Sequence, residues 1–129
     1  LYRSDDGGAN WRSLPSPYNG SFFGLLPLDG ESLLAFGLRG NLFRSDDGGN
    51  SWRSVPSGAT AMLTDGLRGP DGTLLLVGLS GTVLRSIDGG ASWQLAQQED
   101  RRGLSAIAAA GSAGVVAVGE GGSRRLPLR

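Results

Sequence analysis

The 129-residue chain contains no cysteine and no histidine. Without cysteine it has no disulfide and no thiolate metal site. Without histidine it lacks the commonest general base and metal ligand, which excludes a Ser-His-Asp triad, a Cys-His pair and a histidine-based zinc site. Lysine is also absent, and twelve arginines balance twelve acidic residues. A net charge of zero gives no strong field to attract nucleic acid or an anionic membrane surface.

Long apolar runs are missing as well. No segment approaches the roughly 20 residues of a membrane-spanning helix, and no signal peptide is visible. The chain begins at Leu1 rather than at a methionine, which agrees with the removal of an upstream segment. Glycine, by contrast, is abundant at 23 residues, against a usual share of about 7 %. This excess predicts many tight turns and few long helices.

One short motif occurs three times. SDDGGANW at 4–11 returns as SDDGGNSW at 45–52 and as SIDGGASW at 86–93, and each step is 41 residues. We call these stretches box 1, box 2 and box 3. Three glycines (Gly37, Gly78 and Gly119) and three arginines (Arg3, Arg44 and Arg85) recur with the same spacing. A fixed period of this length indicates a repeat architecture.

Each 41-residue unit contains four segments suited to short strands. In the third unit we expect strands at 73–79, 82–86, 93–96 and 104–110, with box 3 in the turn between the second and third of them. The segment 104–110 is rich in alanine and would also suit a helix. Its counterparts at 22–28 and 61–67 contain glycine or proline, so we predict a strand there too.

Four strands per 41 residues predict an all-β fold, a β-propeller of four-stranded antiparallel blades with about three blades' worth present. We assign 1–129 to one propeller segment. It comprises the third and fourth strands of a blade at 1–14, blades at 22–55 and 61–96, and the first strands of a further blade at 104–129. The fourth box is lost, because Pro127 and Arg129 occupy its serine and aspartate positions. The loose ends together are expected to make up one blade.

Three blades are too few to close a ring, since propellers have typically 4–8. An open arc exposes strand edges and the apolar faces of its end blades. Three explanations remain open at this stage. The chain is a partial propeller from a larger ring, or two copies associate to close an oligomeric ring, or the arc packs against other domains.

The boxes resemble Asp-box repeats, also called bacterial neuraminidase (BNR) repeats, with the pattern S-x-D-x-G-x-x-W. The matching residues are Ser4, Asp6, Gly8 and Trp11; Ser45, Asp47, Gly49 and Trp52; and Ser86, Asp88, Gly90 and Trp93. A short carboxylate that accepts backbone N–H groups, beside glycines with positive φ, suits a structural turn. Box 3 has Ile87 in place of the first aspartate, which indicates that Asp5 and Asp46 are dispensable for the turn.

A role for these aspartates in metal binding or catalysis is less well supported than a structural role in the turn. An EF-hand loop needs a glutamate at its twelfth position, where this chain has Pro17 and Gly58 when counted from Asp6 and Asp47. We predict no metal site, no catalytic residue and no cofactor.

The longer stretches FGLRGNLFRSDDGGNSW at 36–52 and VGLSGTVLRSIDGGASW at 77–93 are similar to repeats of the photosystem II stability/assembly factor family. The resemblance covers nearly the whole chain and implies a seven-bladed propeller. It also implies a non-catalytic bacterial protein, exported to the periplasm or lumen. Its partner would be another protein, such as a membrane protein under assembly, with no direct membrane insertion and no nucleic acid.

Four arginines break the repeat and are our candidates for partner binding: Arg39, Arg68, Arg101 and Arg102. All four fall in predicted loops or turns, where repeat scaffolds carry function. Arg3, Arg44 and Arg85 recur, so we expect them to pack or pair structurally.

The alternative is a sialidase-like glycoside hydrolase propeller fragment or a carbohydrate-binding module, because Asp boxes also occur in such proteins. Most glycosidases need paired carboxylates. The aspartates outside the boxes (Asp29, Asp65, Asp71 and Asp100) have no obvious partner in the sequence, and the Arg-Ile-Pro type motif of sialidases is absent. We therefore predict a protein that is not an enzyme.

Overall fold

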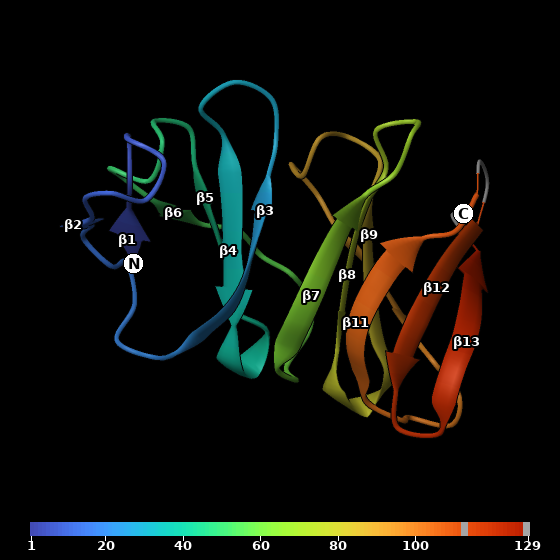
Figure 1. The fold of residues 1–129 in the computed structure, drawn as a ribbon. Helices are drawn as coiled ribbons and strands as arrows, with labels where there is room; N and C mark the ends of the chain where they lie inside the picture. Colours follow the sequence, from blue (N-terminus) through green and yellow to red (C-terminus); the bar gives the residue numbers. More distant parts are fainter. Residues whose placement is uncertain (112–113, 128–129) are drawn as a thin grey trace.

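The computed structural model describes residues 1–111 and 114–127, and Arg129 of the lost fourth box lies outside them. This part of the chain is all-β, with strands arranged in four antiparallel sheets that stand side by side in chain order (Figure 1). The first sheet pairs β1 (Tyr2–Arg3) with β2 (Arg12–Ser13). Two short 3-10 turns, η1 (Leu38–Gly40) and η2 (Leu79–Gly81), each connect two successive strands. No helix in the described ranges is long and apolar enough to cross a membrane.

Two complete four-stranded sheets form the centre of the arc. One has the order β3 (Phe22–Pro27), β4 (Leu33–Gly37), β5 (Leu42–Ser45) and β6 (Arg53–Ser54). The other has the order β7 (Leu63–Arg68), β8 (Leu74–Gly78), β9 (Thr82–Ser86) and β10 (Gln94–Gln97). Each strand pairs with its sequence neighbours, as in a propeller blade. The prediction of four-stranded antiparallel blades is confirmed.

The last sheet contains β11 (Leu104–Ala109), β12 (Gly114–Gly119) and β13 (Gly122–Pro127). The alanine-rich segment is thus a strand. β13 pairs with β12 over six residues, which corrects the expectation that the two loose ends together make up one blade. β1 and β13 both occupy the third position of a blade. Over the described residues, the two ends therefore hold five strands rather than the four of a single blade.

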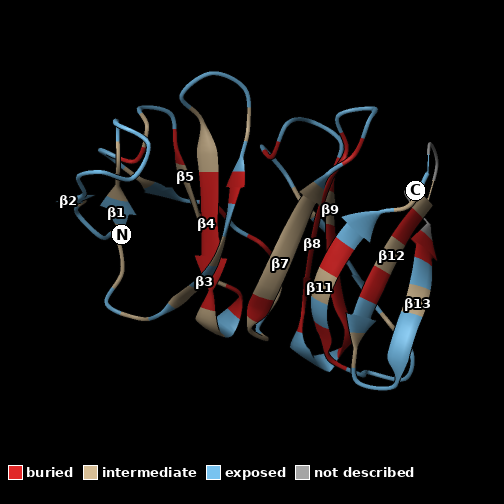
Figure 2. Ribbon diagram, viewed as in Figure 1, coloured by how far each residue is buried: buried red, intermediate tan, exposed pale blue. Residues whose placement is uncertain are grey.

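The core lies between the blades rather than within them (Figure 2). β8 is buried along its whole length and alternates between two clusters. Leu74 and Leu76 face the preceding blade, where they join Phe36, whereas Leu75 and Val77 pack with residues of the following sheet. Successive side chains of a strand point to opposite faces, so a continuous apolar run indicates burial on both faces.

The recurring glycines allow neighbouring backbones to approach closely. A Cβ on Gly78 would lie 2.1 Å from the carbonyl oxygen of Met62, just before β7. The corresponding distances are 2.3 Å at Gly37 and 2.2 Å at Gly119, again to backbone oxygens. The requirement for glycine at these positions therefore comes from the lack of space for a side chain.

We expect Gly78→Ala to destabilise the fold by about 1–3 kcal/mol, because overpacking against a backbone oxygen forces strands apart. Chemical denaturation with matched slopes measures this change. Gly103→Ala is the control, since its Cβ would meet only the side-chain ends of Leu79 and Glu120, at 3.2 and 3.3 Å. Equal losses for the two variants would contradict the close-approach argument.

Candidate functional site

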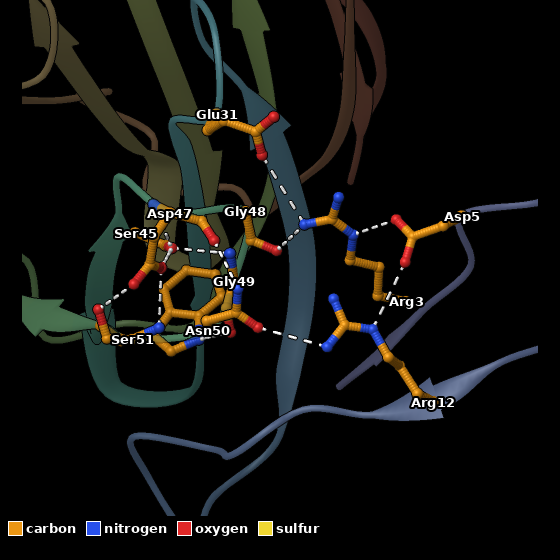
Figure 3. Close-up of polar contacts among 11 residues, drawn as sticks. Arg3, Asp5, Arg12, Glu31, Ser45, Asp47, Gly48, Gly49, Asn50 and Ser51 are labelled. Carbon is orange, nitrogen blue, oxygen red and sulfur yellow. Dashed lines mark hydrogen bonds and ion pairs between the residues drawn. The ribbon is translucent and has the colours of Figure 1, made fainter.

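Box 2 forms a closed network of hydrogen bonds between β5 and β6 (Figure 3). The Ser45 hydroxyl donates to Asp47 Oδ1 at 2.8 Å and accepts the N–H of Gly49 at 2.8 Å. Asp47 Oδ1 also accepts the N–H of Ser51 at 2.8 Å, while Oδ2 accepts the Ser51 hydroxyl at 2.5 Å. Trp52 Nε1 donates to the Gly49 carbonyl at 3.0 Å. Both carboxylate oxygens are thus occupied by the turn itself.

Boxes 1 and 3 repeat this network. The serine hydroxyls accept the N–H of Gly8 at 2.8 Å and of Gly90 at 2.9 Å. Both glycines in each box have positive φ, between 70° and 95° across the three boxes, which is a conformation glycine adopts at low cost. The three aspartates therefore hold turns at the same end of successive blades.

These hydrogen bonds also change the acidity of the box aspartates. The Ser51 hydroxyl, then the Ser51 N–H and the Ser45 hydroxyl, lower the pKa of Asp47 to about 2. The Ser92 hydroxyl, its N–H and the Ser86 hydroxyl lower the pKa of Asp88 to about 2. Donors that bond the charged form of a carboxylate favour ionisation.

The recurring arginines connect one blade to the next. Arg3 Nη1 donates to the Gly48 carbonyl of box 2 at 2.9 Å, and Arg44 Nη1 donates to the Gly89 carbonyl of box 3 at 2.8 Å. Each contact spans 45 residues and reaches from the third strand of one blade to the box of the following blade. Arg3 and Arg44 are therefore inter-blade arginines, each anchored on the turn that the neighbouring box holds in place.

The first acidic position of the box supports these arginines, which corrects the sequence interpretation. Asp5 Oδ1 accepts Arg3 Nε at 2.7 Å, and Asp46 Oδ1 accepts Arg44 Nε at 2.9 Å. Asp46 also accepts the Ser32 hydroxyl at 2.7 Å, and these bonds, Ser32 first, lower its pKa. Asp5 and Asp46 are dispensable for the turn, but they orient the inter-blade contact.

The third unit shows what happens without that aspartate. Ile87 replaces it, and the Nε of Arg85 is buried with no hydrogen-bond partner among the described residues. A buried unpaired donor costs free energy that its paired counterparts avoid. Sequence comparison of the repeats could have revealed this link, since the arginine and the first aspartate are two residues apart in both units that have the pair.

The structure places the four candidate arginines at two different ends of the blades. Arg39 lies in η1 between β4 and β5, and Arg101 and Arg102 lie between β10 and β11. In an antiparallel blade these connections share one end, opposite the boxes. Arg68 ends β7 at the box end, where it pairs with Asp29 of the preceding blade at 2.8 Å. Arg68 is therefore separated from the other three.

Arg39 and Arg101 share two features: a left-handed backbone conformation and a side chain without a polar partner in the described chain. Their φ values are 58° and 52°, in the left-handed region that glycine favours. The counterparts of Arg39 are Ser80, with φ 58°, in the third unit and Gly121 in the last sheet, so this backbone conformation recurs and only the cationic side chain is particular to Arg39. Both are exposed, and within the described ranges neither side chain has a hydrogen bond or ion pair. Arg102 instead lies near Asp100, which Arg124 binds through both carboxylate oxygens at 3.2 and 2.6 Å.

The aspartates outside the boxes are engaged in structural contacts. Asp65 accepts the N–H groups of Gly66 and Ile107, each at 2.9 Å, and so links β7 to β11. Asp71 accepts the N–H of Thr73 at 3.1 Å. Across the residues that the structure describes, no three acidic side chains gather closely enough to hold a metal ion. The candidate surface is therefore the pair Arg39 and Arg101 at the end opposite the boxes.

Comparison with known proteins shows which solved structures share this fold. No protein-family model and no curated protein sequence matches the chain. Among solved structures, it is similar to "YCF48 bound to D1 peptide", with a TM-score of 0.64 and 20 % identity over 93 % of this chain and 40 % of that one. YCF48 from Cyanidioschyzon merolae gives 0.62 and 20 % over 94 % of this chain and 45 % of its own. The chain is a partial β-propeller that spans less than half the length of either structure.

The lowered pKa values of Asp47 and Asp88 predict acid sensitivity. Aspartate in an unfolded chain has a pKa of about 3.9, so these groups stabilise the fold above that pH and lose their contribution as the pH falls through the folded value of about 2. We expect the denaturation midpoint to fall between about pH 4 and pH 2. Asp47→Asn/Asp88→Asn should be less stable at pH 7 and show a shallower acid limb. Asp29→Asn is the control, and an unchanged limb in the double variant contradicts the assignment.

The unpaired Arg85 predicts a stabilising substitution. Ile87→Asp restores the residue that binds the inter-blade arginine Nε in the other two units, and we expect it to add about 1 kcal/mol to the free energy of unfolding. Denaturant unfolding at pH 7 measures the gain, which should disappear in the Arg85→Met background. Ile87→Ser serves as the control for removing an exposed apolar side chain. A gain from Ile87→Ser equal to that from Ile87→Asp would argue against the arginine.

Proposed function

We propose that this chain is a non-catalytic protein-binding module of the assembly-factor type. Its partner is an extended segment of another protein, such as a membrane protein under assembly, and it needs no cofactor. The proposal is supported by the propeller fold shared with YCF48, an assembly factor, one structure of which has a bound D1 peptide. The resemblance of the repeats to the photosystem II stability/assembly factor family points the same way, and it favours an exported, periplasmic or lumenal compartment.

Arg39 and Arg101 are the residues that we assign to this binding. The observation that carries the assignment is that both keep a long cationic side chain at a left-handed position without using it within the described chain. Backbone conformations of this kind cost free energy and cluster at functional sites. Arg68, the remaining candidate from the sequence, lies at the box end in an ion pair with Asp29, so we do not include it in this surface.

The chemistry of the ligand follows from the guanidinium groups. A planar guanidinium binds a carboxylate through two parallel hydrogen bonds, which gives both energy and orientation. Two such groups on loops of different blades suit an extended peptide with acidic side chains or a free carboxylate. Arg102 contributes positive potential beside them, since Asp100 is already bound to Arg124.

The alternative, a sialidase-like hydrolase, would need a tyrosine nucleophile beside a glutamate, and the surroundings of Tyr18 do not favour that role. Tyr18 packs against Phe22 and Phe43, with ring centroids 6.0 Å away in each case. It is therefore part of an aromatic cluster next to β3 and β5, and no glutamate contact in the described chain activates it. The aspartates outside the boxes bind backbone amides or arginines, as described above.

Glycine substitutions test the proposal without damaging the fold. Arg39→Gly/Arg101→Gly removes both cations at positions whose φ glycine adopts at lower cost, so the variant should be at least as stable as the native chain. We expect it to bind a panel of labelled acidic peptides about 10-fold or more weakly, because two charge-assisted contacts are lost. Fluorescence anisotropy at fixed salt measures the affinity.

The matched control is Arg68→Ala/Arg125→Ala, which removes the same charge away from the proposed surface. Arg125 Nη1 lies 3.3 Å from the Cβ position of Gly114, at the box end of its sheet. This control should bind the peptides as the native chain does. Equal weakening in both double variants, or no binding of any acidic peptide to the native chain, would overturn the proposal.

A further inference from the structure

The outermost strand of the third unit differs from its two counterparts. β2 and β6 are each two residues long, read Arg-Ser, and are followed two residues later by Pro15 and Pro56. Charge, shortness and proline are the devices by which proteins keep an edge strand from pairing with another chain. In these two units the outer edge carries all three.

β10 carries none of them. Its sequence is Gln-Leu-Ala-Gln, it pairs with β9 over four residues, and Gln97 stands where the other units have proline. All four side chains are exposed, with Leu95 at 46 %. The neighbouring ion pair is also missing: Asp46 contacts Arg53 at 3.3 Å in the second unit, whereas Ile87 and Gln94 occupy these positions in the third. Together, these substitutions leave β10 without a charged residue.

The hydrogen bonding of β10 shows which backbone groups are free. The N–H of Gln98 donates to the Gly81 carbonyl at 2.8 Å, so Gln98 and every second residue before it face β9. Leu95 and Gln97 therefore direct their N–H and C=O groups outward. β10 is the last strand of its sheet, so this edge has no neighbouring strand within the described chain.

We propose that this edge is a self-association surface, on which β10 of a second copy pairs antiparallel. The outward groups define the register, since Leu95 must lie opposite Gln97 of the second copy for both to exchange hydrogen bonds. Ala96 then meets its own copy at the two-fold axis, as an isologous interface requires. The strand is uncharged, and the charged residues 99–102 lie opposite positions 90–93, which carry no charge. Arginine-bearing β2 or β6 would bring like charges together in such a pair.

Gln97→Pro and Gln97→Ala form a matched test. Both remove the side chain whose Nε2 donates to the Ser80 carbonyl at 2.8 Å, but only proline removes the outward N–H. Sedimentation equilibrium over a concentration series should show the native chain and Gln97→Ala reaching twice the 13.3 kDa of the chain. Gln97→Pro should weaken self-association by about 10-fold or more, because two of the four new backbone hydrogen bonds are lost.

A cross-link tests the register independently, since the chain has no cysteine of its own. Ala96→Cys should form an intermolecular disulfide rapidly, because directly opposed residues of a non-hydrogen-bonded antiparallel pair have Cα atoms about 4.5 Å apart. Ser54→Cys, on the exposed strand β6, is the control and should stay reduced under the same conditions. This inference does not depend on the peptide partner proposed above.

Two results would overturn the edge-pairing proposal. One is a native chain that remains at 13.3 kDa at the highest concentrations, together with an Ala96→Cys variant that cross-links no faster than Ser54→Cys. The other is a dimer that Gln97→Pro leaves intact, which would assign the contact to the ends of the arc and to ring closure instead.

Discussion

The fold depends on one constraint, which is that the middle strands of each blade are apolar on both faces. β8 buries Leu74 and Leu76 on one side and Leu75 and Val77 on the other, so a blade buries both faces of its middle strands only between two neighbours. The recurring glycines bring the inner strands of a blade close enough to pack. The inter-blade arginines then connect the third strand of one blade to the carbonyls of the next box. The box aspartates matter because they hold those carbonyls in place.

Most of this architecture was predictable because three copies of one unit show where its strands end and its turns begin. Three boxes, three glycines and alternating strand segments at one period left few alternatives to a propeller blade. The repeat even decided the alanine-rich segment 104–109, whose local composition favours a helix. Its counterparts contain glycine or proline, which disfavour a helix. In the structure the segment pairs with β12 as a strand.

Two features were not predictable from the linear pattern. β13 was missed because Arg124 stands where Leu42 and Val83 mark the same strand, and Pro127 replaces the box serine. Pairing with β12 and burial of Leu126 nevertheless form the strand. The full role of Asp46 was missed because Ser32, which is 14 residues away in the sequence, reaches it only when the turn between β3 and β4 folds beside the end of β5. The link to Arg44, two residues away, was open to comparison of the repeats. The absence of this aspartate from box 3 suggested that it was dispensable, whereas the structure shows an unpaired Arg85 there.

Differences between the repeats carry more information about function than the repeats themselves. A position that obeys the pattern is explained by packing, by the box turn or by the inter-blade contact. Arg39 occupies a backbone position that suits glycine, and β10 has lost the charge, the proline and the ion pair that protect the other outer strands. Neither change improves the stability of the blade on its own. Both therefore direct attention to what approaches from outside, at the loop end in one case and at the strand edge in the other.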